Sequence, residues 1–227
     1  MGCSIFCYLI LLLIIKSVMA IHTLELFSGG KSFSKNHQHK NIAIDIDLKS
    51  KPDLCVDVAN FNYREYPVGF FAIIWASPPC TEYSRAKTVG ERKLQQADKI
   101  VLVTIEIIEY LKPKYYYIEN PHTGMLRHRE FMAGRYFFVV DYCKYGYNYR
   151  KRTAIWTNNK EFKPRPLCKK DCPYTLNNYG RHVGGFGTRT TTCNRIAKYS
   201  VPSELILEIL ASQGELRSVP VPAVQNN

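Results

Sequence analysis

The sequence predicts an α/β protein with a doubly wound, mostly parallel β-sheet and helices on both faces of that sheet. Short apolar runs of strand length alternate with segments of helical periodicity along most of the chain. Small or polar residues that suit ligand binding follow directly after several of these runs. Because ligands of such sheets bind at the carboxyl ends of the strands, we expect one site there.

The first four expected strands are apolar runs in the amino-terminal third of the chain. They cover residues 21–27 (IHTLELF), 41–47 (NIAIDID), 54–58 (LCVDV) and 70–76 (FFAIIWA). The run at 70–76 contains no charged residue, as is typical of a strand covered on both faces. We therefore expect this strand to be buried.

A helix and three further strands are expected next. Apolar residues recur at helical spacing over residues 94–111, at Leu94, Ala97, Val101, Ile105, Ile108 and Leu111. The expected strands cover 115–120 (YYYIEN), 136–143 (YFFVVDYC) and 152–158 (RTAIWTN). This order of elements favours βαβ units and hence a parallel sheet.

The chain divides into a core and several smaller parts. The apolar run at 4–15 is too short to span a bilayer and lacks the preceding positive charges of a secretory signal. We expect 1–18 to be a leader outside the fold, and no membrane association. The remaining parts are a core at 19–158, a short basic segment at 159–194, a C-terminal helix at 195–212, and a tail at 213–227.

The charge balance favours a polyanionic partner. Among 227 residues, 31 Lys and Arg stand against 19 Asp and Glu, which gives a net charge of +12. An ordinary basic surface is the alternative. The eight cysteines lack the tight spacing of a disulfide scaffold, which indicates an intracellular, reducing compartment.

The loop after the first expected strand has the composition of a cofactor-binding loop. Ser28, Gly29 and Gly30 follow the strand, and Asp45 ends the next one. Glycines allow a ligand to approach the backbone, and a carboxylate one strand later can bind ribose hydroxyls. Asp47 suits that task equally, and both acids could instead simply end an exposed strand. A phosphate-binding P-loop is excluded because Glu25 stands where its first glycine belongs.

A cysteine follows two prolines directly after the expected strand at 70–76. Pro78 and Pro79 stiffen the backbone and carry Cys80 away from the sheet in an extended segment. A buried thiol is otherwise only a small hydrophobic group. Cys80, Asp57 and Glu119 all lie at or just beyond expected strand ends, which predicts that they belong to one site.

Five segments together resemble the cytosine-5 DNA methyltransferases, in particular the short forms of iridoviruses and tailed phages. They are LELFSGG (24–30), Pro-Pro-Cys (78–80), Glu-Asn-Pro (119–121), NYRKR (148–152) and RIAKYSVPSELILEIL (195–210). The resemblance spans residues 24–210. It implies that the core at 19–158 is catalytic and that the C-terminal helix at 195–212 returns to that core. It implies an S-adenosylmethionine-dependent methyltransferase fold and, for a viral protein, the host nucleus or cytoplasm.

The resemblance also implies catalytic roles for individual residues. Cys80 would add to carbon 6 of cytosine, and Glu119 would hydrogen-bond ring nitrogen 3 as an acid. The basic run is ambiguous in register by one residue. We favour Arg152 as the residue that holds the cytosine oxygen, with Lys151 next, and expect Arg150 to bind DNA.

The implied cofactor is S-adenosylmethionine, which donates the methyl group to carbon 5 of cytosine. Phe27 would pack on the cofactor. The other residues implied in binding it are Ser28, Gly29, Gly30, Asp45, Asp57 and Pro78. The loop departs from the family pattern at Lys31 and Ser32, which replace residues that are usually small.

The basic segment at 159–194 stands where larger family members carry a whole target-recognition domain. It is rich in Pro, Gly, Lys and Arg and has too few apolar residues for a second core. Arg181, His182 and Arg189 could read base edges or contact phosphates of double-stranded DNA. We expect a monomer.

Two cysteines in this segment, Cys168 and Cys172, have the spacing of a zinc-ligand pair, with His182 and Cys193 following. Only one tight pair is present, however. Free reduced thiols are therefore favoured, and no metal is expected.

Three other functions are compatible with parts of the pattern. An exocyclic amino methyltransferase also places Ser-Pro-Pro after its fourth strand, but an aromatic residue would follow where Cys80 stands. Methylation of RNA or a free nucleotide would suit the missing recognition domain. An inactive nucleic-acid-binding relic is disfavoured because Cys80 and Glu119 are both present.

Overall fold

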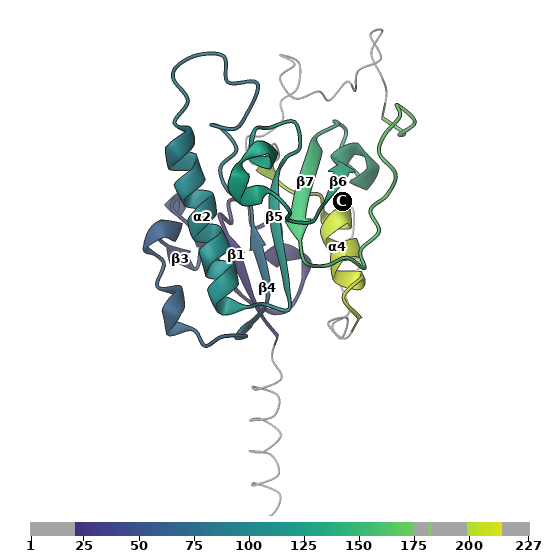
Figure 1. The fold of residues 1–227 in the computed structure, drawn as a ribbon. Coiled ribbons are helices and arrows are strands. Elements are labelled where there is room, and N and C mark those ends of the chain that lie inside the picture. The colour runs from purple at the N-terminus through teal and green to yellow at the C-terminus, as the bar shows by residue number, and fades with distance from the viewer. Residues whose placement is uncertain (1–20, 175–181, 183–198, 215–227) are drawn as a thin grey trace, which may run out of the picture.

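The fold is that of a computed structural model that describes residues 21–174, 182 and 199–214 (Figure 1). A single seven-stranded sheet runs through it in the order β3-β2-β1-β4-β5-β7-β6. The strands are β1 (His22–Leu26), β2 (Lys40–Asp45), β3 (Leu54–Cys55), β4 (Phe71–Ala76), β5 (Tyr115–Pro121), β6 (Phe137–Asp141) and β7 (Arg152–Thr157).

Strand directions confirm the predicted fold class. β3, β2, β1, β4 and β5 are mutually parallel, whereas β7 runs antiparallel to both of its neighbours, β5 and β6. The carboxyl ends of β1, β4 and β5 therefore lie at one edge of the sheet. The predicted strand at 54–58 is shorter than expected, because Asp57 instead caps the 3-10 turn Val58–Asn60.

One α-helix packs on each face of the sheet. Along β4, Ile74 belongs to the hydrophobic cluster that contains Val101 of helix α2 (Leu94–Leu111). Its neighbour Trp75 belongs to the cluster that contains Ile206 of helix α4 (Ser203–Ala211). Successive side chains of a strand point to opposite faces, so the two helices cover opposite faces, as Figure 1 shows.

The C-terminal helix packs on the sheet, and the described helix begins only at Ser203, after Pro202. The backbone N–H of Val201 donates to Ser32 Oγ at 3.1 Å, beside the loop that follows β1. After the helix, Gln213 Nε2 donates to the hydroxyl of Tyr117 on β5 at 2.8 Å. These contacts tie the C-terminal helix to both the loop and the sheet.

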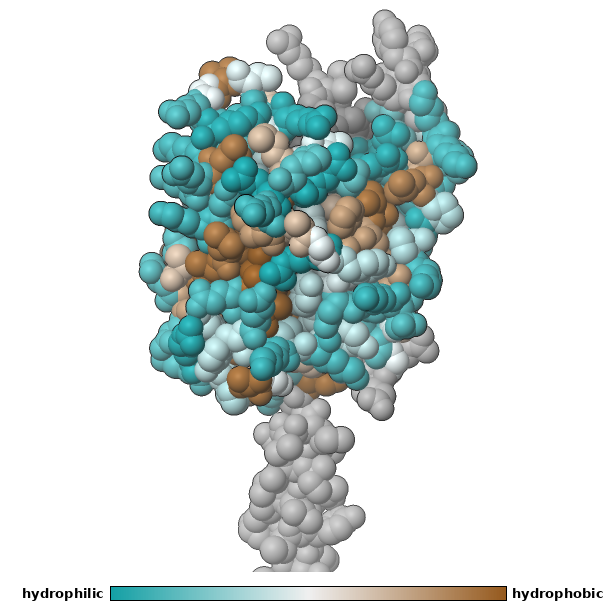
Figure 2. Space-filling model, in the orientation of Figure 1, coloured by the Kyte–Doolittle hydropathy of each residue, from teal (hydrophilic) through white to brown (hydrophobic). Residues whose placement is uncertain are grey.

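The outer surface on the face shown in Figure 2 is mostly hydrophilic, with apolar side chains in separate patches. Among the described residues, no helix is long and apolar enough to cross a membrane. The expected leader at 1–18 lies outside the described residues, and so does the expected tail at 213–227 apart from its first two residues.

Candidate active site

A pocket opens at the carboxyl ends of β1, β4 and β5. Its walls come from the loop after β1, the Pro-Pro-Cys segment after β4, the end of β5 and the residue before β7. The lining residues are Glu25, Phe27, Ser28, Gly29, Gly30, Ser32, Ser77, Pro78, Pro79, Cys80, Thr81, Glu119, Lys151 and Tyr199. Of the residues predicted from the sequence, the pocket contains Phe27, Ser28, Gly29, Gly30, Pro78, Cys80, Glu119 and Lys151.

The loop after β1 is held in an uncommon backbone conformation. Phe27, Gly29 and Lys31 all have positive φ angles, of 58°, 45° and 53°. For a bulky residue such as Phe27 this conformation is costly, and such strain concentrates at functional sites. The loop therefore requires side-chain support from the rest of the protein.

That support comes from Glu25, which the sequence analysis used only to exclude a P-loop. Its carboxylate is buried beneath the loop and accepts hydrogen bonds from the backbone N–H groups of Phe33 at 2.9 Å and Ser34 at 3.0 Å. Burial raises the pKa of Glu25, and these hydrogen bonds oppose the rise. Glu25 therefore fixes the path of the chain that leaves the pocket.

Asp45 supports the same loop from the end of β2. Its Oδ2 accepts a hydrogen bond from Gly29 N at 2.8 Å, and its Oδ1 accepts one from Asp47 N at 2.8 Å. Asp57 caps a 3-10 turn through the N–H of Ala59 at 2.9 Å. Neither Asp45 nor Asp57 is among the residues that line the pocket. Of the two, Asp45 is the one in direct contact with the loop.

Ser28 presents a polar atom that the described protein does not satisfy. Its Oγ is buried and has no hydrogen-bond partner among the described residues, although Ser28 lines the pocket. Buried hydroxyls are almost always paired, because leaving one unpaired costs about 1–3 kcal/mol. The pocket thus offers a hydrogen-bonding group suited to a polar ligand.

The Pro-Pro-Cys segment is clamped from two sides. Asn120 at the end of β5 donates from Nδ2 to the carbonyl oxygen of Pro78 at 2.9 Å. The backbone N–H of Tyr83 donates to the carbonyl oxygen of Cys80 at 3.1 Å. Cys80 is a free thiol on the pocket wall. These two bonds hold the carbonyl groups of Pro78 and of Cys80 itself, and so fix the path of the backbone that carries the thiol.

The ionisation of Cys80 depends on its neighbours in the pocket. Burial raises the pKa of the Cys80 thiol, the ammonium of Lys151 lowers it, and the carboxylate of Glu119 raises it. Lys151 is thus the cation that favours the thiolate form, which is the nucleophilic one.

Glu119 is buried at the end of β5, where only 5% of the residue is exposed. Its Oε1 accepts hydrogen bonds from the Tyr142 hydroxyl at 2.9 Å and from Lys151 Nζ at 3.1 Å. The Lys151 ammonium also lies 5.0 Å from the centre of the Tyr142 ring. Since both bonds reach Oε1, Oε2 is the carboxylate oxygen suited to a ligand.

Of the residues in the basic run, Lys151 lines the pocket. Arg152 points to Asp141, which accepts bonds from Nε at 2.9 Å and from Nη2 at 2.7 Å. Arg152, which the sequence favoured for holding the cytosine oxygen, does not line the pocket, whereas Lys151 does. Arg150 is exposed, as expected of a residue available to DNA.

The expected base-reading residues are mostly outside the described part of the chain. Arg181 and Arg189 lie there, as does Cys193. His182 is described, and it is buried against Cys168 and Cys172 rather than exposed to a partner. Cys143, which the sequence analysis did not connect with these residues, joins the group.

Sequence reasoning also missed Tyr142 and Asn120. Tyr142 reaches Glu119 from the turn after β6, a contact between segments 23 positions apart that no local pattern reveals. Asn120 was within the quoted Glu-Asn-Pro segment, and its position beside Glu119 was the available signal. Adjacent residues of a strand point to opposite faces of the sheet, so Asn120 cannot share the direction of Glu119. The structure shows that Asn120 instead holds the Pro78 carbonyl.

The comparisons with known proteins agree with this geometry. The family model "C-5 cytosine-specific DNA methylase" matches residues 28–161. A "Probable DNA (cytosine-5)-methyltransferase" of Frog virus 3 (isolate Goorha) is 34% identical over 213 residues, which cover 82% of this chain and 97% of the relative.

Two solved structures are also similar. A putative DNA modification methyltransferase encoded within an E. coli prophage aligns at 15% identity and a TM-score of 0.46, over 65% of this chain and 52% of its own. A mutant of Spodoptera frugiperda DNMT2 aligns at 16% identity and a TM-score of 0.46, over 69% and 58%. The chain thus spans between half and three-fifths of these two solved chains.

Proposed function

The chain belongs to the C-5 cytosine-specific DNA methylases, and on that premise we propose that it methylates carbon 5 of cytosine in double-stranded DNA through a transient covalent bond to Cys80. The observation that carries the proposal is the grouping of Cys80, Glu119 and Lys151 in one pocket, beside the loop at the end of β1. A nucleophile, an acid and a cation are the groups that this reaction requires.

The target base has to leave the duplex to reach this pocket, because Cys80 cannot approach carbon 6 inside the base stack. The Cys80 thiolate then forms a sulfur–carbon bond to carbon 6. The electron pair of the 5,6 double bond shifts as ring nitrogen 3 takes up a proton, and carbon 5 becomes nucleophilic. Lys151 assists the first step because it lowers the pKa of Cys80.

Glu119 has the position of the acid in this scheme. Its Oε1 already accepts hydrogen bonds from Tyr142 and Lys151. Oε2 would therefore carry the proton that is donated to ring nitrogen 3. After carbon 5 is methylated, it loses its original proton to solvent, the sulfur–carbon bond breaks, and Cys80 leaves as a thiolate. The proton on nitrogen 3 returns to Glu119, which restores the site.

The loop after β1 fits S-adenosylmethionine, which when bound supplies an electrophilic methyl group. The unpaired Ser28 Oγ offers a hydrogen bond, and Gly29 and Gly30 leave the backbone accessible. Phe27 would pack on the cofactor. Asp45 would bind ribose hydroxyls while keeping the loop in place through Gly29 N, and Pro78 would close the wall opposite.

Asp57 is retained among the proposed cofactor ligands on the family resemblance. We retain Arg150, Arg181 and Arg189 as proposed DNA contacts. The chain has a net charge of +12, which favours binding to the negatively charged phosphates of DNA. We further propose that the protein acts as a monomer in a reducing compartment, in the host nucleus or cytoplasm if it is viral.

A trapping experiment tests the proposed reaction. The protein is incubated with labelled S-adenosylmethionine and a duplex that contains 5-fluorocytosine, whose fluorine replaces the proton that must leave. We expect a covalent protein–DNA adduct that withstands denaturation, and its loss in Cys80→Ser, because a serine hydroxyl stays protonated near neutral pH. Cys55→Ser, at an exposed free cysteine, is the matched control.

The same assay separates the alternatives. Single-stranded DNA, RNA and free cytidine nucleotides are offered beside ordinary duplex DNA, and the methylated position is identified by mass spectrometry. An adduct that forms equally well in Cys80→Ser, or a methyl group on the exocyclic amine, would refute the proposed mechanism. Preference for RNA or a nucleotide would refute the proposed substrate alone.

A further inference from the structure

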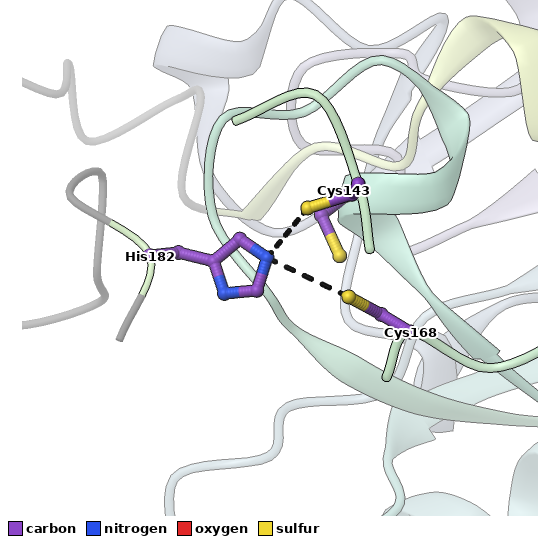
Figure 3. Close-up of side chains that lie close together, drawn as sticks. Cys143, Cys168 and His182 are labelled. Atoms are coloured by element: carbon purple, nitrogen blue, oxygen red, sulfur yellow. Dashed lines mark hydrogen bonds between the residues drawn. The ribbon is translucent and has the colours of Figure 1, made fainter. Parts of the chain in front are cut away.

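Three cysteines and one histidine gather outside the pocket, on the far side of Tyr142. Cys143 lies in the 3-10 turn Tyr142–Tyr145 after β6, whereas Cys168 and Cys172 lie in the segment after β7. The imidazole of His182 completes the group. The ligand atoms of all four residues lie within 4.8 Å of one another. Figure 3 shows the imidazole of His182 directed at the sulfur atoms of this group, with a dashed line to Cys168.

The distances suit a tetrahedral metal ion. His182 Nε2 lies 2.8 Å from Cys172 Sγ and 3.7 Å from Cys168 Sγ. Zinc–sulfur bonds of about 2.3 Å and a zinc–nitrogen bond of about 2.0 Å place sulfurs about 3.8 Å from each other and about 3.5 Å from the nitrogen. The observed group therefore needs only small side-chain adjustments to surround zinc.

The group is buried without forming a disulfide. Cys143, Cys168 and His182 are 2%, 5% and 7% exposed, and the cysteines of the described residues are free thiols. Three thiols and an imidazole are thus packed together with no disulfide among them to stabilise the group. Binding of a soft-ligand cation by the thiolates would supply both charge balance and bonding.

The surrounding backbone is arranged as around a metal-bound thiolate. The N–H of Lys170 donates to Cys168 Sγ at 3.3 Å, and Lys170 itself has a positive φ of 71°, which makes the tight turn between Cys168 and Cys172. The N–H of Cys168 donates to the buried carboxylate of Asp141 at 3.0 Å. Such outer contacts orient metal ligands in proteins.

We propose that Cys143, Cys168, Cys172 and His182 bind one zinc ion. Because four protein ligands leave no open coordination position, the site is structural rather than catalytic. The ion fastens the segment after β7 to the turn after β6. That segment has few apolar residues with which to build a core of its own, so a metal replaces the missing hydrophobic packing. This proposal does not depend on the proposed methyl transfer.

Metal analysis of the whole chain tests the proposal without any activity assay. The protein is produced with zinc in the medium, purified under reducing conditions and measured by plasma mass spectrometry. We expect about one zinc ion per chain, as a single closed site requires. Cys143→Ala and Cys168→Ala should lose the zinc, and Cys55→Ala should retain it.

Cobalt substitution guards against variants that fail to fold. Co²⁺ added to metal-free wild-type protein should give the visible d–d bands of a tetrahedral site and the near-ultraviolet charge-transfer band of thiolate ligands. His182→Cys, which keeps four ligands, should retain the metal with a stronger thiolate band. A wild-type protein with neither zinc nor these bands would overturn the proposal, and so would a folded Cys143→Ala that keeps its zinc.

Discussion

The ammonium of Lys151 donates a hydrogen bond to Glu119 and also lowers the pKa of Cys80. Replacing Lys151 by glutamine removes this cation. The ammonium is largely buried, with 12% of its side chain exposed, so solvent screens it little. A hydrogen bond to a charged group contributes about 1.5–3 kcal/mol. If this contribution is made in the transition state, kcat/KM should fall roughly 10- to 150-fold.

The pH dependence separates this role from a merely structural one. Burial already raises the pKa of Cys80, so kcat/KM should increase with pH as the thiolate forms. Loss of Lys151 removes the influence that lowers this pKa. The rising limb of kcat/KM plotted against pH should therefore move to higher pH in Lys151→Gln. Lys151→Arg keeps the positive charge and should restore the position of this limb in part.

The measurement is single-turnover methylation of a duplex across a pH series, with melting temperatures recorded for each variant. Arg152→Gln is the matched neighbour: it should lower the melting temperature, because buried Asp141 loses its ion pair, and leave the rising limb in place. A limb that moves in Arg152→Gln and stays in Lys151→Gln would refute the assignment of Lys151 to the site.

Three further predictions follow from the same contacts. Glu119→Gln should lower kcat about 100- to 10,000-fold with little change in DNA affinity measured by filter binding, since an amide cannot pass a proton; a loss of only a few-fold would make Glu119 structural. Asp45→Ala should weaken S-adenosylmethionine binding in calorimetry by roughly 10- to 150-fold, through a charged acceptor contribution of about 1.5–3 kcal/mol, whereas Asp47→Ala should leave it unchanged. Deletion of residues 1–18 should leave the melting temperature and methylation rate unchanged, because β1 begins at His22; loss of folding would contradict this.

The sequence was sufficient to predict the fold class and the meeting of Cys80 and Glu119 in one pocket. Cys80 and Glu119 each follow a strongly apolar strand, and parallel strands bring their carboxyl ends to one edge of the sheet. Their meeting in one pocket therefore follows from strand order alone. Asp57 shows the limit of this rule, because it also follows a short strand and instead caps a turn away from the pocket lining.

The choice between Lys151 and Arg152 was beyond the sequence. The two residues are neighbours at the start of β7, where successive side chains point to opposite sides. A shift of one residue exchanges their environments. What decides the register is the pairing of β7 with β6, which sets Arg152 opposite Asp141. The apolar pattern of each of these two strands does not indicate which strand it pairs with.

Cys143 was missed because its contacts, too, join segments that are distant in the sequence. Its position connects the pocket residues around Glu119 with the proposed zinc ligands. It directly follows Tyr142, whose hydroxyl donates to Glu119. Asp141, the residue before Tyr142, accepts bonds from both Arg152 and the backbone of Cys168. The turn after β6 therefore contacts Glu119, the proposed catalytic acid, through Tyr142 and contributes Cys143 to the proposed zinc site. A zinc ion bound there would attach the segment after β7 rigidly to this turn. The consecutive residues Asp141, Tyr142 and Cys143 would then set the orientation of that segment relative to the pocket.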